Sequence, residues 1–372
     1  MLIERVEAYN FRSYAELEFG PGAGLNLVVG ENASGKTNLL EAIYLGAYGK
    51  GFRGADADLL MWGQSRAELT ANFEVGGGVH KTVHVEIRAR SKSLFLGNKK
   101  LGRRQDLVGQ FPVVLSGAWD FDIAAGDPRA RRRYIDGLLG LLSPAYLVTL
   151  RDYTRALKQR NLLLNEFREA SADVLQEKIR PWTESLIGYG AVICARREAM
   201  TQELQGRVGE FYRIIAGAEQ EVEIVYQPNA RALEGSYADG LRAAYERAWE
   251  KERKRGITLV GPHLDDLVMK VGGVELRRFG SRGEQKTAVL ALRVAQVELI
   301  AEKRGERPVL LVDDVFSDLD IGRAERFLEV LDGTQVVATS AEEERVVDVL
   351  ARRGMRAKLF RVAQGQLMEL QA

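Results

Sequence analysis

The chain has 372 residues, with 53 Lys and Arg against 52 Asp and Glu, a formal charge of +1, and 46% apolar residues. This composition excludes a globally disordered chain and a uniformly basic nucleic-acid coat protein, although a basic face balanced by an acidic face is compatible with it. No apolar run approaches a membrane span, the N-terminus lacks an apolar signal core, and Cys194 is the single cysteine. We therefore expect a cytoplasmic protein with no membrane association, no internal disulfide and no Cys-rich metal site.

The first 120 residues predict a mixture of strands and helix. Residues 25–29 form a short apolar run that predicts a buried strand, and residues 37–48 have the apolar spacing of a helix. Residues 69–96 alternate as strands do, and Gly76–Gly77–Gly78 interrupts them as a hairpin turn would. His80 and His84 lie in this alternation, so we do not expect them to bind a metal.

Residues 127–218 change to helical apolar stripes with heptad character, which predict a short bundle or antiparallel arm, and Pro181 should begin or kink a helix. Strand patterns return at 221–225, 257–260, 267–271, 308–312 and 335–339, with helices over 281–303 and 321–331. The predicted fold is an α/β head divided by a helical insertion. The expected boundaries are 1–126 for the first lobe of the head, 127–218 for the arm and 219–372 for the second lobe.

The segment between the first buried strand and its helix matches the phosphate-binding pattern G-x-x-x-x-G-K-[ST]. Its glycines permit a tight backbone path whose N–H groups, together with the helix N-terminus, bind phosphate. We expect Lys36 to contact the β- and γ-phosphates of ATP and Thr37 to place its hydroxyl on Mg²⁺. The predicted nucleotide-binding residues here are Gly30, Glu31, Asn32, Ala33, Ser34, Gly35, Lys36, Thr37 and Asn38.

Two carboxylates follow the strand at 308–312. Asp313 is predicted to hold the Mg²⁺ shell, directly or through water, because an apolar strand that ends in a carboxylate is the second half of such a site. Asp314 stands where ATPases of the cassette type carry the carboxylate that polarises the attacking water. Those ATPases usually have Glu there, and Asp is one methylene shorter, so slow turnover is expected.

Ser281, Arg282 and Gly283 open a helix about 30 residues before that strand, which by itself is ordinary helix-capping chemistry. The order of the segments resembles that of ATP-binding cassettes. By this resemblance, residues 281–286 correspond to the signature motif, where a Ser hydroxyl binds the γ-phosphate on the opposite protomer. Residues 315–320, which end at Asp320, correspond to the D-loop. The resemblance thus adds Ser281, Gly283 and Asp320 to the nucleotide site.

Over nearly its whole length the chain closely resembles the RecF family of bacterial recombination-mediator ATPases, relatives of SMC proteins. The resemblance rests on residues 10–14, 30–38, 131–136, 261–267, 281–286 and 311–320. The chain departs from the family at Leu264, where Arg is usual, and at Glu284, where Gln is common. It has no clear Gln-loop glutamine near residues 115–120 and no switch histidine after Thr339 and Ser340.

The resemblance implies an ABC/SMC-like P-loop ATPase head with an inserted helical arm. It implies that ATP closes a homodimer on double-stranded DNA near single-strand–double-strand junctions and that weak, DNA-stimulated hydrolysis releases it. It also implies a role in gap repair and the SOS response, RecR as a partner, RecA loading as the outcome, and a nucleoid-associated protein of the cytoplasm. Arg12 would lie near the nucleotide by this resemblance, or else is a surface residue in a turn. Arg131–Arg132–Arg133 could support the nucleotide lobe, touch DNA or form a solvated helix face.

DNA binding must come from the distribution of charge, because the net charge does not indicate it. Residues 88–104 contain seven Lys and Arg and no Asp or Glu, and Gly97–Asn98 suggests a hairpin that displays its lysines. The DNA candidates are Arg88, Arg90, Lys99, Lys100, Arg103 and Arg104, with residues 251–255 as a second cluster. A solvated hairpin is the alternative. The segment has Phe95 as its single aromatic residue, so single-strand stacking is not indicated.

Three other functions are open. A nucleotide-binding subunit of another ABC-type machine fits poorly with a helical arm between Lys36 and Ser281. A P-loop small-molecule kinase leaves residues 281–286 unexplained. A scaffold that binds ATP with negligible hydrolysis would have the same site residues, so the sequence does not separate it from a slow ATPase.

Overall fold

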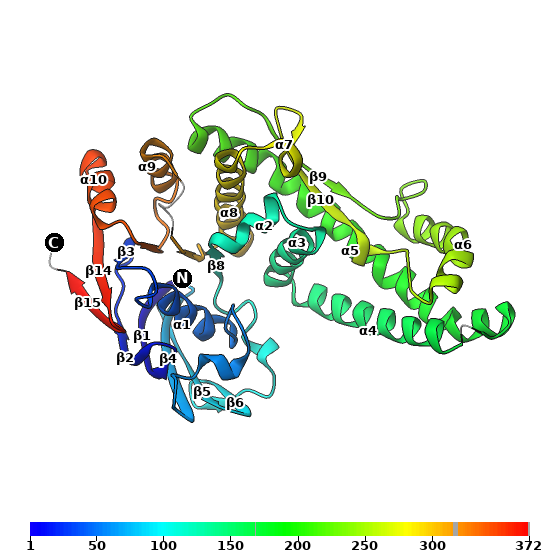
Figure 1. The fold of residues 1–372 in the computed structure, drawn as a ribbon, viewed down its shortest axis with the longest axis horizontal. Helices are drawn as coiled ribbons and strands as arrows, with labels where there is room; N and C mark the ends of the chain where they lie inside the picture. The colour runs from blue at the N-terminus through cyan, green and yellow to red at the C-terminus, as the bar shows by residue number, and fades with distance from the viewer. Residues whose placement is uncertain (168, 315–318, 371–372) are drawn as a thin grey trace. The chain divides into compact units, whose positions relative to one another are not determined.

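The computed structural model describes residues 1–167, 169–314 and 319–370. The chain forms two compact units, coloured along its length in Figure 1. The head unit comprises Met1–Phe121, Arg207–Glu221 and Gly280–Ala372, and the arm unit comprises Asp122–Gly206 and Val222–Phe279. These limits differ from the boundaries expected at 127 and 219, because most of the segment 219–279 belongs to the arm unit and not to the second lobe of the head.

Two sheets of six strands build the head unit. The antiparallel sheet has the order β2-β1-β4-β5-β6-β7, with β1 (Leu2–Phe11), β2 (Tyr14–Phe19), β4 (Arg66–Val75), β5 (Val79–Arg88), β6 (Ser91–Leu96) and β7 (Lys99–Lys100). The second sheet has the order β15-β14-β3-β13-β12-β8, with β3 (Leu25–Val29), β8 (Val113–Ser116), β12 (Val309–Val312), β13 (Val336–Ser340), β14 (Ala357–Ala363) and β15 (Gln366–Leu370). Its strands are parallel except for β15.

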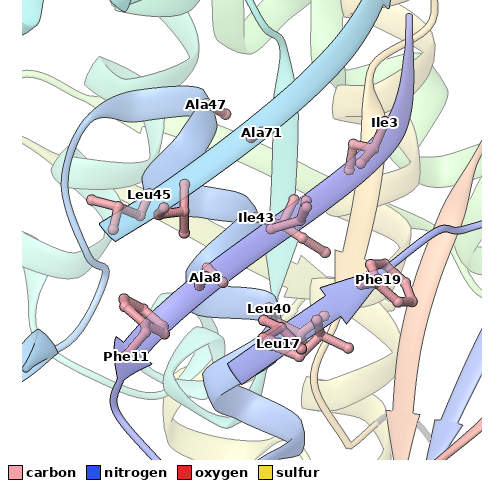
Figure 2. Close-up of a cluster of buried hydrophobic side chains, with 14 of the residues drawn as sticks. Ile3, Ala8, Phe11, Leu17, Phe19, Leu40, Ile43, Leu45, Ala47 and Ala71 are labelled. Atoms are coloured by element: carbon pink, nitrogen blue, oxygen red, sulfur yellow. The ribbon is translucent and has the colours of Figure 1, made fainter. Parts of the chain in front are cut away.

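The helices of the head unit are α1 (Lys36–Tyr48), α8 (Arg282–Arg304), α9 (Ile321–Glu329) and α10 (Glu343–Arg353), with short turns η1 (Asp56–Leu59), η2 (Arg104–Leu107) and η3 (Ala118–Asp120). The core of the unit joins α1 to both sheets. Figure 2 shows part of it, where Leu40 and Ile43 of α1 pack with Ala8 of β1 and Leu17 of β2. Alternate residues of β4 and of the second half of β5 point into this core, as the period of two in the sequence predicts, whereas the buried residues of β1 and β2 are spaced by two or three.

The parallel strands β3, β12 and β13 end at one edge of their sheet, because they run in the same direction and in matched register. The segments that leave this edge are the phosphate loop after Val29, the two carboxylates after Val312, and the residues that follow Ser340. In α/β sheets of this kind the carboxyl edge is where ligands bind. The fold therefore brings together segments that are about 300 residues apart in the sequence.

The arm unit contains α3 (Pro128–Leu142), α4 (Pro144–Glu166), most of α5 (Ala172–Ala216), α6 (Tyr237–Arg255), α7 (Leu276–Phe279) and η4 (Pro262–Leu264). Helix α2 (Phe121–Ala124) begins at the boundary between the units. The arm unit also holds a small antiparallel sheet of β9 (Val222–Gln227), β10 (Asp266–Val271) and β11 (Val274–Glu275). Pairing of β9 with β10 holds residues 222–279 together, which explains why they do not join the head.

The stripes over 175–189 and 204–215 are parts of one helix of 45 residues, α5. Pro181 lies inside this helix and does not begin it, and the alternative expectation of a kink stays a prediction. One expectation for this region is wrong. The expected strand at 257–260 is absent from the structure. There, side chains replace a neighbouring strand as hydrogen-bond partners: Asn161 Oδ1 accepts from Thr258 N at 2.8 Å, and Glu252 Oε1 accepts from Leu259 N at 2.7 Å. Within the described residues, no helix combines the length and apolarity needed to cross a membrane.

Candidate ATP site

The phosphate loop lies between β3 and α1, as its pattern predicts. A Cβ atom on Gly30 would stand 2.3 Å from the carbonyl oxygen of Val362, so only glycine fits where the loop passes β14. Gly35 has a φ of 121°, and a Cβ atom there would meet Ser13 Oγ at 2.8 Å. These two contacts explain why the pattern requires glycine at both ends of the loop.

Lys36 folds back over this loop. Its Nζ donates to the carbonyl oxygens of Gly30 at 2.6 Å and Glu31 at 2.8 Å. Burial lowers the pKa of the Lys36 ammonium, while the negative charges of Asp314 and Asp313 act in the opposite direction. A lysine that caps the mouth of the loop in this way stands where it can exchange two carbonyl partners for phosphate oxygens.

Thr37 and Asp313 meet at the first residues of α1. The Thr37 hydroxyl donates to the Asp313 carboxylate, with Oγ1 at 3.0 Å from Oδ1 and 2.9 Å from Oδ2, across 276 positions of sequence. A hydroxyl and a carboxylate are hard oxygen ligands, and Mg²⁺ commonly takes one or two such groups and keeps water and phosphate in its other positions. The pair therefore fits the metal expected there. No cluster of three or more His, Cys, Asp or Glu suited to a metal ion occurs among the described residues.

Thr339 at the end of β13 completes this group, although no sequence motif pointed to it. Its Oγ1 donates to Asp313 Oδ1 at 2.8 Å and accepts from the backbone N–H of Asp314 at 2.9 Å. Asp314 has a φ of 52°, in the left-handed region that a residue other than glycine adopts only at an energetic cost. Thr339 thus fixes the carboxylate of Asp313 and the backbone of Asp314. The sequence signal that could have indicated Thr339 is a polar residue at the carboxyl end of β13, the strand beside β12.

A cavity of about 410 Å³ adjoins the two carboxylates. Its lining includes Asp313 and Asp314, the segment Ser116–Gly117–Ala118, and Arg282 and Lys286 from the first turns of α8. Residues 115–120 contain no clear Gln-loop glutamine. The structure nevertheless brings Ser116 to the site, since its carbonyl oxygen accepts from Asp313 N at 2.8 Å.

Ser281 is the N-cap of α8 and forms a reciprocal capping box with Glu284. Glu284 Oε2 accepts from Ser281 N and from Ser281 Oγ, both at 2.8 Å, and these bonds lower the pKa of the Glu284 carboxyl. A Cβ atom on Gly283 would lie 2.8 Å from Arg323 Nη1. Arg323 in turn pairs with Asp320, which caps α9. The other residues of the expected D-loop, 315–318, lie outside the described residues.

Arg12 pairs with a residue of α1, and Asn38 of α1 contacts Ser13 in the turn before β2. Arg12 Nε lies 2.8 Å from Oε2 of the fully buried Glu41, and Arg53 Nη2 lies 2.9 Å from the same oxygen. Asn38 accepts from Arg53 and donates to Ser13 Oγ at 2.8 Å. Arg12 is therefore ion-paired instead of free in a surface turn. Glu41 and Arg53 were not anticipated, because their pairing is not local in sequence.

The DNA candidates are all exposed but fall in two places. Arg88 and Arg90 lie at the end of β5 and in the turn that follows it. Lys99 and Lys100 form β7, which pairs with β6 through the predicted Gly97–Asn98 turn, and Arg103 and Arg104 follow at η2. On the solvent face of the antiparallel sheet Glu7 lies opposite Glu18 and Glu68 opposite Glu86, and these carboxylates are ion-paired with Arg5 and Arg66. The candidates lie at the border of the sheet, where Arg88 shares the solvent face of β5 with Glu86.

In the arm unit, Arg131 is buried and pairs with Asp266, with Nε at 2.6 Å from Oδ1. Arg132 donates to the carbonyl oxygen of Asp265, and Arg133 alone of the three is exposed. Arg131 therefore stabilises the arm instead of offering its charge to DNA. Cys194 is buried, and burial raises the pKa of its thiol to about 12.

Together, the sheet order, the phosphate loop and the carboxylates after β12 define a P-loop ATPase head of the ABC/SMC type. The family model described as "RecF/RecN/SMC N terminal domain" matches residues 2–358. The DNA replication and repair protein RecF of Halalkalibacterium halodurans is 34% identical over 99% of both chains. The chain belongs to the RecF family.

Solved structures agree with this assignment. A structure of the recombination mediator protein RecF-ATP in the RecFOR pathway matches with a TM-score of 0.87 and 27% identity, over 99% of this chain and 97% of that one. An Smc head domain from Pyrococcus furiosus, solved with the C-terminal domain of ScpA, matches with a TM-score of 0.57 and 14% identity, over 99% and 96%. The second likeness concerns the fold alone.

Proposed function

We propose that the chain is an ATP-dependent DNA-binding protein of gap repair and recombination. The observation that carries the proposal is the contact of Thr37 with Asp313 beside the loop closed by Lys36, because it joins the two halves of a Mg²⁺–ATP site. The family membership and the ATP form of the solved relative support the same ligand.

Each residue has a separate task in this proposal. Lys36 moves from the loop carbonyls to the β- and γ-phosphates, and Thr37 and Asp313 supply oxygen ligands to Mg²⁺. The bound metal ion neutralises charge on the phosphates. Asp314 orients the attacking water, with its backbone held by Thr339. Because Asp314 is shorter than the usual Glu, we expect hydrolysis to be slow and DNA to accelerate it.

We further propose that ATP closes a homodimer in which Ser281 of one protomer meets the γ-phosphate bound by the other. A two-fold dimer of this kind contains two equal sites, and whatever stabilises the dimer also tightens ATP binding. The test is a mixing experiment with Ser281→Arg and Lys36→Met. Neither variant should dimerise with ATP alone, whereas a mixture can rebuild one intact site and recover part of the dimerisation. Full dimerisation by Ser281→Arg alone would contradict the shared site.

The proposed DNA ligand is duplex DNA beside a single-stranded gap, bound by the basic border of the antiparallel sheet. Neutral substitutions at Lys99, Lys100, Arg103 and Arg104 should weaken binding to all sequences alike. They should also reduce the log–log salt slope by roughly 0.9 for each DNA phosphate that the protein no longer neutralises. The matched control removes charge at residues 251, 253 and 255 of α6. If the control alone weakens binding, the DNA site lies on the arm.

The resemblance extends the proposal to partners. We propose that the chain acts with RecR to help load RecA at gaps, as a nucleoid-associated protein of the cytoplasm. Binding of purified RecR to the wild-type chain with ATP and gapped DNA tests this part. The same preparations are used to show that wild type binds DNA more tightly than Lys36→Met. If RecR then fails to bind wild type, RecR is removed from the proposal and the ATP-dependent DNA binding stays.

A further inference from the structure

Trp62 is the most exposed large apolar residue described in the structure, at 98% of its full accessible surface. It stands at the tip of a tight turn in which Gln64 N donates to the carbonyl oxygen of Met61 at 2.9 Å. Gly63 has a φ of 81°, which the third position of a type II turn requires. The indole contributes almost nothing to the core, so its whole apolar surface is available to a ligand.

The turn is firmly attached to the antiparallel sheet. Met61 N donates to the carbonyl oxygen of Asn10 at 2.8 Å, Arg12 N donates to that of Leu59 at 2.9 Å, and Phe11 and Leu60 form a β-bridge. The indole is therefore displayed from backbone that is already ordered. A preordered contact loses less conformational entropy on binding than a loose loop would.

Cationic side chains lie at the same end of the sheet. Turn η1, three residues before Trp62, packs beside β5 and is held by an ion pair of 2.6 Å between Asp56 and Lys92 of β6. Arg66, at the start of β4, is opposite Arg88, at the end of β5, and Arg90 follows in the next turn. Among the described residues, neither Arg88 nor Arg90 has an ion-pair partner.

We propose that Trp62 stacks on an unpaired base of DNA while Arg88 and Arg90 bind the adjacent phosphates. Proteins hold single-stranded nucleic acid by stacking its bases on aromatic side chains and by binding its backbone with positive charge. An exposed ring beside arginines combines these two features. Segment 88–104 has the half-buried Phe95 as its single aromatic residue, and a different loop thus supplies an exposed one. This inference rests on the proposed DNA binding and deepens it: Trp62 would distinguish a gap from continuous duplex.

The test compares Trp62→Ala, Trp62→Phe and wild type as full-length chains with ATP and Mg²⁺. The DNAs are a labelled duplex with a gap of about ten nucleotides and a continuous duplex of the same length, within the size that single-strand sites cover. Met368→Ala, which removes an apolar side chain that is 48% exposed in the same unit, is the matched control. Intrinsic tryptophan fluorescence is recorded in parallel.

Trp62→Ala should raise the Kd for gapped DNA about 5- to 150-fold, the range for one stacked base, and should change the Kd for continuous duplex less than about twofold. Trp62→Phe should retain most of the affinity. Gapped DNA should quench the fluorescence of wild type more than that of Trp62→Phe. Equal losses on both DNAs, or no loss on either, would overturn the inference while leaving the proposed DNA binding in place. A wild-type chain that binds neither DNA would overturn both.

Discussion

Thr339→Val removes one hydroxyl and keeps the shape of a fully buried side chain. The Asp313 carboxylate loses a hydrogen bond of 2.8 Å, and the backbone N–H of Asp314 loses an acceptor at 2.9 Å. A hydrogen bond to a charged group contributes about 1.5–3 kcal/mol, and an unsatisfied buried N–H costs about 1–3 kcal/mol. We therefore expect the free energy of unfolding of the head to fall by about 2.5–6 kcal/mol.

The same substitution removes one anchor of the Asp313 carboxylate and one of the Asp314 backbone, so ATP hydrolysis should fall about 10- to 100-fold, in line with the effect of a misplaced catalytic group. Urea unfolding and single-turnover hydrolysis measure the two effects. Thr339→Ser keeps the hydroxyl and should behave nearly as wild type. Thr201→Val, in α5, also loses a buried hydroxyl bond but should leave hydrolysis unchanged. Unchanged stability and hydrolysis in Thr339→Val would refute the assignment of Thr339.

Three further predictions concern other ionisable groups. Glu41→Ala leaves two guanidinium groups without their fully buried carboxylate, so the free energy of unfolding measured in urea should fall by about 3–5 kcal/mol. A fall below about 1 kcal/mol would contradict this. Glu284→Gln removes a carboxylate from beside Ser281, so ATP-dependent dimerisation measured by light scattering should strengthen about two- to fivefold, and weaker dimerisation would show that the carboxylate helps. Burial lowers the pKa of His263 to about 4, below its ordinary 6.5, so the arm should lose stability as pH falls from 6.5 to 4. Thermal unfolding at each pH measures this loss, which His263→Gln should reduce.

The sequence predicted local features well where one segment contains the whole signal. The strand before Gly30, the phosphate loop and α1 form such a segment, and so does the hairpin at Gly97–Asn98. Ser281 was also predicted to begin a helix, and the structure adds that Glu284 reaches back to it. The hydrogen bonds that fix α1, the hairpin and the start of α8 join residues only a few positions apart, whereas the strand before Gly30 pairs with β13 and β14, more than 300 positions away.

Features that depend on distant partners were not predictable in the same way. Glu41 looked like one more polar residue of an amphipathic helix, and its burial became visible only with Arg12 and Arg53 around it. Residues 257–260 have the composition of a strand, but a strand also needs a neighbour. Trp62 could not be predicted as a candidate, because its distinguishing property is its exposure, which a sequence pattern does not indicate.

A single-turnover assay of ATP hydrolysis, with and without duplex DNA, tests the central claim most directly. Protein in excess over labelled ATP and Mg²⁺ is followed over time, with Lys36→Met as the blank. The proposed site predicts slow conversion of ATP to ADP by wild type, faster conversion with DNA, and none by Lys36→Met. ATP that stays intact on wild-type protein would indicate a scaffold without catalysis, and equal conversion by Lys36→Met would contradict the site itself.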